Sequence, residues 1–94
     1  MEQAASREQL AEALRAHSVH DPYVLLFGPD NPDRPGRYVL RVMLAVPGDR
    51  PLGQIWAAGS LERARDMMPA AMVRLPRVLT TPRPGLIEQW ALPR

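Results

Sequence analysis

The most regular pattern of apolar residues lies between residues 37 and 46 and predicts a β-strand. In a strand, successive side chains point to opposite faces of the sheet. One face here is wholly apolar, and the other is apolar except for Arg41. Runs with β-branched or aromatic residues predict three more strands, over residues 23–27, 52–58 and 86–92. The strand over 52–58 follows a short connector and is expected to form a hairpin with the strand over 37–46.

Two segments have the apolar spacing of amphipathic helices. Leucines at helical spacing predict a helix over residues 6–17, with Ser6 as its N-cap residue. A second helix is predicted over residues 61–68, with Ser60 as its N-cap residue. The following stretch, residues 70–85, is proline-rich and has no clear period, so the sequence leaves open whether it is a loop or contains a strand.

Together these elements predict an α+β fold in the order α-β-β-β-α-β. A three- to four-stranded, mainly antiparallel sheet with an N-terminal helix and a short second helix before the last strand fits this order. The last strand follows a helix and is therefore a candidate to pair in parallel through a right-handed crossover. Pro followed by Gly predicts type II turns over 34–37 and 83–86. No linker or repeat divides the 94 residues, so a single domain over 1–94 is expected.

The strand over residues 37–46 has more apolar side chains than expected for a single sheet with one solvent-exposed face. Two explanations are open: either its second face contacts a partner, or the N-terminal helix and proline-rich loops wrap that face within the chain. For the first explanation, Arg41 is expected to bind a carboxylate of the partner. The expected contact residues are Val39, Arg41 and Met43 from the strand and Met67 from the rim of the second helix.

The charge of the chain favours a nucleic-acid partner less than its isoelectric point suggests. The isoelectric point is about 9.9, but the net charge is only +2, because the chain has neither lysine nor cysteine to titrate at high pH. A lysine-free, arginine-rich composition is typical of a GC-rich bacterial genome. The alternative function, RNA or DNA binding, rests on Arg74, Arg77 and Arg83, which lie in a segment, residues 67–85, without an acid.

Candidate catalytic and metal-binding residues are few. The absence of cysteine excludes disulfides, thiolate catalysis and cysteine-ligated zinc sites. His17, His20 and Asp21 have metal-ligand residue types, but His17 also suits a helix C-terminus and the other two suit a solvated turn. Glu62 and Glu88 are expected to be solvated rather than paired for acid–base catalysis. No glycine-rich phosphate loop is present, so the sequence predicts a protein that is not an enzyme and has no cofactor.

No apolar run approaches the length of a membrane span, and no targeting segment is visible, so the expected location is the cytoplasm. With catalysis and membrane insertion both disfavoured, the sequence predicts a non-catalytic protein-interaction module. We expect it to be a homodimer, or a subunit or regulator of a larger assembly, that binds a protein partner through the apolar sheet face.

Overall fold

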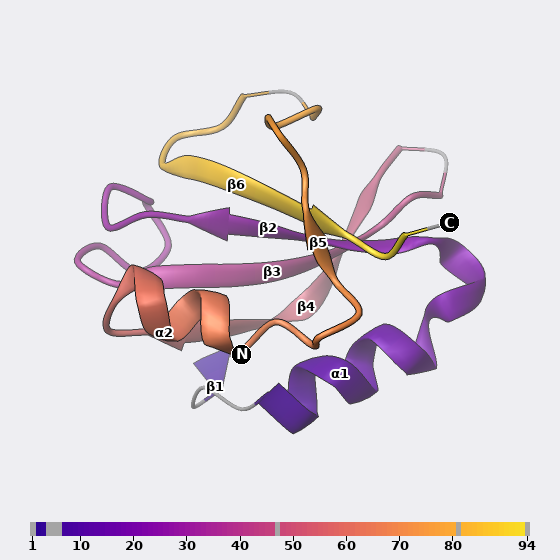
Figure 1. Cartoon of the computed structure of the whole chain (residues 1–94). Coiled ribbons are helices and arrows are strands. Elements are labelled where there is room, and N and C mark those ends of the chain that lie inside the picture. Colours follow the sequence, from indigo (N-terminus) through magenta and orange to yellow (C-terminus); the bar gives the residue numbers. More distant parts are fainter. Residues whose placement is uncertain (1, 4–6, 47, 81, 94) are drawn as a thin grey trace.

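The computed structural model describes residues 2–3, 7–46, 48–80 and 82–93 of the chain (Figure 1). In this part of the chain the fold is α+β, as the sequence predicts, with one six-stranded sheet and two α-helices. Neither of these helices is long and apolar enough to cross a membrane. The elements follow in the order β1 (Glu2–Gln3), α1 (Arg7–Ala16), the 3-10 turn η1 (Ser18–His20), β2 (Pro22–Phe27), β3 (Tyr38–Leu44), β4 (Arg50–Ala58), α2 (Leu61–Asp66), β5 (Val73–Arg74) and β6 (Leu86–Ala91).

The six described strands lie in the order β1-β4-β3-β2-β6-β5, with β3 and β2 at the centre. β1 runs parallel to β4, and every other neighbouring pair is antiparallel. The expected count of three to four strands did not include β1, which has only two residues. The stretch over residues 70–85, left open by the sequence, contains the two-residue strand β5. The suggested parallel crossover is wrong, because β6 pairs antiparallel with β2. After α2 the chain forms β5, and β6 then runs antiparallel to β5, so the chain direction is reversed between these two strands (Figure 1).

Both helices lie where the apolar spacing predicts them. The expected N-cap residue of α1, Ser6, lies outside the described residues. Ser60 caps α2 as predicted, because its hydroxyl accepts a hydrogen bond of 3.1 Å from a backbone N–H in the first turn. α2 ends at Asp66 rather than Met68. The cause is Pro69, which has no N–H to donate and disfavours helical backbone at the residue before it.

One face of the sheet carries the larger of two cores, and both helices cover it (Figure 1). Leu10 and Leu14, the predicted stripe of α1, are buried here together with Trp56 of β4. The first face of β3, which the alternation makes wholly apolar, points into this core. Its other buried members are Val24, Leu26, Leu40, Val42, Ala58, Ala64, Met67, Met68 and Met72.

The opposite face of the sheet carries a second, smaller core. Its buried residues are Tyr23, Leu25, Phe27, Val39, Met43 and Ile55. Proline-rich loops border this core, since Pro32 and Pro84 line a hollow beside Phe27 together with Pro51 of β4. Of the two explanations that the sequence left open, the wrapping of this face within the chain therefore accounts for its apolar residues. The loops do this, whereas α1 packs on the larger core.

Asn31 fixes the loop between β2 and β3. Its side chain is 1% exposed, and its Nδ2 group donates to the carbonyls of Gly28 at 2.7 Å, Arg37 at 2.9 Å and Arg34 at 3.2 Å. Its Oδ1 accepts the backbone N–H of Arg34 at 2.6 Å. A single buried amide thus provides partners for backbone groups that a proline-rich loop leaves outside regular structure.

Both predicted type II turns are present, over residues 34–37 and 83–86. In each turn the N–H of the fourth residue donates to the carbonyl of the first at 3.1 Å. The glycine at the third position has the positive φ that this turn requires, +85° at Gly36 and +82° at Gly85. The second turn lies against the β2–β3 loop, because the N–H of Gly28 donates to the carbonyl of Gly85 at 2.7 Å.

Candidate functional site

Two of the residues expected to contact a partner, Val39 and Met43, lie inside the smaller core. They are 1% and 0% exposed. The expectation that these side chains are available to a partner is wrong, because they pack among the other buried side chains of the smaller core. A side chain buried to this extent contacts another molecule only after local unfolding.

Arg41, expected to anchor a partner, makes contacts within its own chain. Its side chain is 22% exposed. Nη2 lies 3.5 Å from the Asp33 carboxylate, and Nη1 lies 3.5 Å from the carbonyl oxygen of Leu52. These long hydrogen bonds link β3 to the loop before it and to β4, so the structure gives Arg41 a place at the rim of the smaller core.

Met67 is 5% exposed, so its expected position on the rim of the second helix is also wrong. The prediction assumed that the helix continues through Met68. Met67 instead follows the last helical residue, and the chain then turns at Pro69. Its side chain joins Met68 and Met72 in the larger core, where the flexible thioethers fill space between the helices and the sheet.

The three arginines of the nucleic-acid alternative do not form one surface. Arg74 and Arg77 line the same hollow, of about 340 Å³, beside Glu88; we call it the Arg74–Arg77 hollow. Arg83 lines a different hollow, together with Phe27 and Arg41, at the smaller core. The structure thus brings two of the three arginines together and leaves the third apart from them.

Glu88 joins α2, β5 and β6 through a carboxylate that is almost buried, at 8% exposed. Its Oε2 accepts hydrogen bonds from Arg65, through Nε at 2.9 Å and also through Nη2, and from Arg74 Nη1 at 3.3 Å. Its Oε1 accepts the indole N–H of Trp90 at 3.0 Å. The expectation that Glu88 is solvated is therefore wrong, because two basic residues and an indole surround it.

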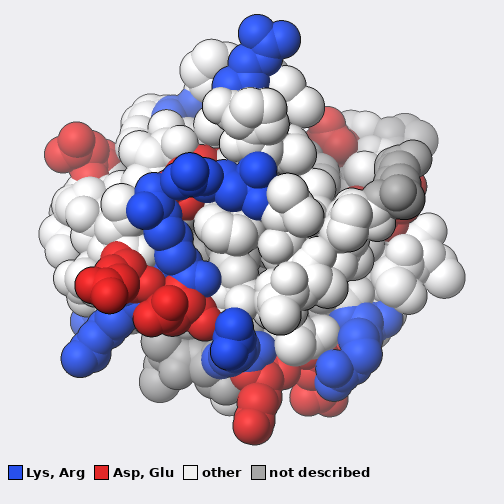
Figure 2. All heavy atoms as spheres, in the orientation of Figure 1, with Lys and Arg blue, Asp and Glu red and all other residues white. Residues whose placement is uncertain are grey.

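Burial and hydrogen bonding act in opposite directions on the pKa of Glu88. Burial by itself raises this pKa, but the hydrogen bonds from Arg65 and Trp90 outweigh burial and hold the pKa below its ordinary value. The carboxylate is therefore charged at neutral pH. Figure 2 shows basic side chains gathered over α2 and β5 on this side of the molecule, with acidic side chains beside α2.

His17, His20 and Asp21 do not form a metal site with the residues that the structure describes. His17 lines a hollow between α1 and β4, whereas His20 ends η1. Asp21 follows with a left-handed backbone, φ +49°, and its N–H donates to the carbonyl of Ser18 at 3.3 Å. Across the described chain, no three histidine, aspartate or glutamate side chains come close enough to hold a metal ion.

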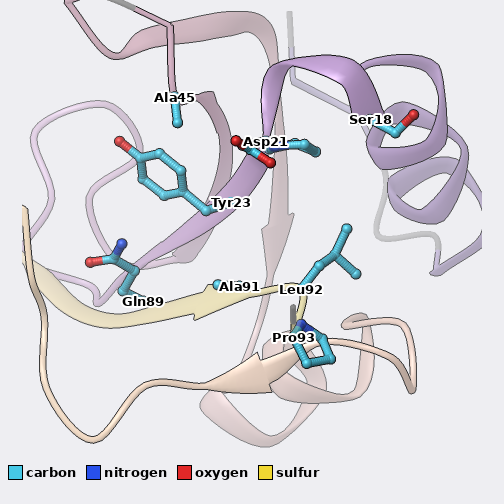
Figure 3. A pocket seen from close by; sticks show the side chains of 9 residues that line it. Ser18, Asp21, Tyr23, Ala45, Gln89, Ala91, Leu92 and Pro93 are labelled. Atoms are coloured by element: carbon cyan, nitrogen blue, oxygen red, sulfur yellow. The ribbon is translucent and has the colours of Figure 1, made fainter.

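A hollow of about 320 Å³ opens beside Tyr23 at one end of the smaller core (Figure 3). Tyr23, Asp21 and Gln89 bring polar groups to its wall, and we call it the Tyr23 hollow. Burial and the nearby Asp49 carboxylate raise the pKa of the Tyr23 hydroxyl, which keeps its proton at neutral pH. The side-chain oxygen of Gln89 already accepts the N–H of Leu79 at 2.9 Å. This hollow offers a hydroxyl and an amide for hydrogen bonding rather than an activated nucleophile.

A mostly apolar groove of about 240 Å³ lies on the other side of Leu92. Ser18 and Leu92 line both this groove and the Tyr23 hollow. Val19, at 84% exposed, follows Ser18, and Val73, at 50% exposed, pairs with the residue before Leu92. We call the groove and these two valines the end patch. The groove is lined by Ala11, Leu14, Arg15, Ser18, Pro69, Ala71 and Leu92.

Sequence reasoning missed the end patch because no single segment carries it. The end of α1, the chain after α2 and the residues after β6 meet at one side of the molecule (Figure 1). Each contributes only one or two apolar residues, which show no period. The available signal is Val19, a large apolar residue between the predicted N-terminal helix and the next predicted strand, whereas Leu92 was placed inside the predicted last strand.

Three surfaces of the described chain thus have chemistry suited to binding. The Tyr23 hollow offers hydrogen bonds, the end patch offers apolar contact, and the arginines around Glu88 offer positive charge. Similarity adds no function to this description, because no protein-family model, curated protein or solved structure matches the chain.

Proposed function

We propose that the protein is a non-catalytic protein-interaction module that binds a second copy of itself through the end patch. The observation that carries this proposal is a mostly apolar groove lined by the exposed Leu92, with two exposed valines next to its lining residues in sequence or strand pairing. Five large apolar side chains are exposed in the described chain, and three of them, Val19, Val73 and Leu92, belong to the end patch. An apolar groove with exposed apolar residues in the neighbouring segments is typical of interaction sites, since burying apolar surface drives association.

The charges at the rim of the end patch favour a second copy as the occupant. Arg15 lines the groove on one side of Leu92, and Asp21 lines the Tyr23 hollow on the other side. In a two-fold symmetric dimer the same surface patch meets itself. Arg15 of one copy then faces Asp21 of the other, while the apolar side chains between them meet at the centre.

Sedimentation velocity at micromolar concentration tests this proposal. We expect the wild-type chain to form a dimer, and Leu92→Asp to be monomeric because it places a carboxylate at the centre of the interface. Ile87→Asp is the matched control, since Ile87 is an exposed apolar residue, at 44%, near the other end of β6 and outside the end patch. A monomeric wild-type chain, or a Leu92→Asp variant that remains dimeric, contradicts the proposal.

The rim charges provide a second, independent test. Arg15→Glu places two carboxylates opposite each other, and we expect it to raise the dimer Kd by about tenfold, since close like charges cost on the order of 1 kcal/mol or more. Adding Asp21→Asn relieves this repulsion and is expected to restore much of the affinity. Asn is chosen because it tolerates the positive φ of this position. An unchanged dimer Kd for Arg15→Glu would show that Arg15 of one copy does not lie opposite Asp21 of the other.

RNA or DNA binding is the second candidate, and one observation favours it. Arg74 and Arg77 line one hollow, and guanidinium groups pair well with phosphate. The position of Arg83 at a different hollow argues against one continuous nucleic-acid-binding surface. We expect binding of this kind to retard an oligonucleotide at about 50 mM salt and to fall steeply as salt increases. The absence of retardation at low salt removes this candidate.

A further inference from the structure

The Arg74–Arg77 hollow combines a concave surface with positive charge that its surroundings do not neutralise. We propose that it is an oxyanion site suited to a phosphate group. It is separate from the end patch, because no residue lines both. The proposal therefore stands or falls independently of self-association.

The charge of the hollow follows from the unequal way in which two arginines share Glu88. Arg65 bonds Oε2 through two nitrogens, with Nε at 2.9 Å, whereas Arg74 reaches the same oxygen only through Nη1 at 3.3 Å. Two guanidinium groups against one carboxylate leave a net charge of +1. Because Arg65 holds Glu88 more closely, we assign the remaining charge to Arg74.

Arg77 adds a second guanidinium to the same hollow. It stands three residues beyond Arg74, where the chain has left β5, and it forms no ion pair with any acid of the described chain. The hydrogen bond from Leu75 N–H to the Gln89 carbonyl, at 2.9 Å, holds this segment beside β6. The remaining wall is partly apolar. The residues that line the hollow are Arg74, Leu75, Pro76, Arg77, Val78, Ile87, Glu88 and Gln89.

A phosphate group fits this chemistry better than a neutral ligand. Guanidinium groups bind its oxygens through paired N–H donors, and such charge-assisted hydrogen bonds are the strong ones. Glu88, the carboxylate in the wall, is already held by Arg65 and by the Trp90 indole. Its charge is therefore directed toward the protein, and Arg74 keeps donors for a ligand on the solvent side, where its side chain is 52% exposed.

An NMR titration with inorganic phosphate tests the site directly. We expect saturable shifts of the side-chain N–H signals of Arg74 and Arg77, and of the Trp90 indole, whose acceptor is Glu88. The indole of Trp56, 1% exposed in the larger core, is the internal control and is expected not to move. Sodium chloride at equal ionic strength is the second control. Equal shifts with chloride would show general screening and overturn the proposal.

Matched variants separate this site from the overall charge of the protein. Arg74→Gln and Arg77→Gln are each expected to raise the phosphate Kd by about tenfold, the usual scale of a hydrogen bond to a charged group. Arg63→Gln removes the same charge from α2, at an arginine that forms no ion pair with Glu88. We expect it to bind phosphate normally. An equal loss in Arg63→Gln would overturn the site. An unshifted Trp90 indole in free Arg77→Gln verifies that the surroundings of Glu88 are intact in that variant, whereas Arg74→Gln removes a hydrogen bond to Glu88, so its fold is verified by an unshifted Trp56 indole.

A short single-stranded RNA distinguishes a confined phosphate site from a nucleic-acid surface. If the site is confined, Arg83→Gln binds inorganic phosphate and the RNA as tightly as the wild-type chain does, because Arg83 lies at another hollow. RNA binding that depends on Arg83 as strongly as on Arg74, without saturable binding of inorganic phosphate, would overturn the proposal in favour of a nucleic-acid backbone.

Discussion

The side chain of Asn31 shows how one residue can hold two loops against the sheet. Its amide bonds the carbonyls of its own loop, and its backbone lies beside the turn at Gly85. A Cβ atom at Gly85 would approach the Asn31 nitrogen to 2.7 Å, closer than such atoms come in proteins. The proline-rich loops at the smaller core are therefore ordered by close backbone contact as well as by their turns.

Replacing Gly85 by alanine should destabilise the protein for two separate reasons. The φ of +82° is costly for any residue with a Cβ, and the new methyl group collides with the Asn31 backbone. Gly36→Ala is the matched control, because Gly36 has φ +85° at the same position of the same turn type but no atom within 4 Å. We expect urea unfolding to show a loss of about 1 kcal/mol for Gly36→Ala and a clearly larger loss for Gly85→Ala. Equal losses in the free energy of unfolding would mean that the contact between the new methyl group and the Asn31 backbone does not destabilise the protein.

The short elements of the fold depend on the contacts of their neighbours. β5 has two residues, yet Arg74 within it bonds the carboxylate of β6 that also receives Arg65 from α2. Two residues cannot form a stable strand alone, so pairing and the shared carboxylate hold β5 in place. Glu88 thus connects α2, β5 and β6 through its hydrogen bonds.

The stability contributed by Glu88 should depend on pH. Its pKa is lowered in the folded protein, so its contribution is fully present above the ordinary glutamate pKa of about 4.3 and is lost as the pH falls through the folded-state value. We expect Glu88→Gln to reduce the free energy of unfolding at pH 7 by about 1–3 kcal/mol. The difference from wild type should shrink below about pH 4.3.

Urea unfolding of both chains between pH 7 and acid pH measures this difference. Glu62→Gln is the control, since Glu62 is an exposed carboxylate on α2 and forms no ion pair with the described residues. Because Glu62 lies in the first turn of α2, its charge contributes only through the helix dipole, and we expect Glu62→Gln to change the free energy of unfolding at pH 7 much less than Glu88→Gln does. A difference between Glu88→Gln and wild type that is constant with pH would show that the ion pairs do not contribute.

At the scale of elements, the sequence predicts those helices and strands whose apolar residues recur at a regular spacing and whose ends have a recognisable signal. The alternation in β3 and the capping by Ser60 gave the strand and the helix start correctly. β1 and β5 are too short to have a period. The direction of β6 depends on the segment after β5, which is held by tertiary contacts such as the hydrogen bond from Leu79 N–H to the Gln89 side chain rather than by local preference.

At the scale of the molecule, apolar residues on both sheet faces correctly indicated that both faces are covered. What covers the second face could not be predicted, because loops rather than helices cover it and their order comes from tertiary contacts of Asn31, Arg41 and Gly85. The end patch was unpredictable for the same reason. Its residues become neighbours only once α1, the chain after α2 and the end of β6 have come together.

The two candidate interfaces, the second sheet face and the end patch, make opposite predictions for Met43. Met43 is 0% exposed in the smaller core, so Met43→Ala leaves a cavity and should reduce the free energy of unfolding by about 2–5 kcal/mol. Because Met43 does not belong to the end patch, the folded variant should dimerise with the wild-type Kd. Urea unfolding and sedimentation velocity on the same samples measure both quantities. If the variant keeps full stability but no longer dimerises, the interface lies on the second sheet face and not at the end patch.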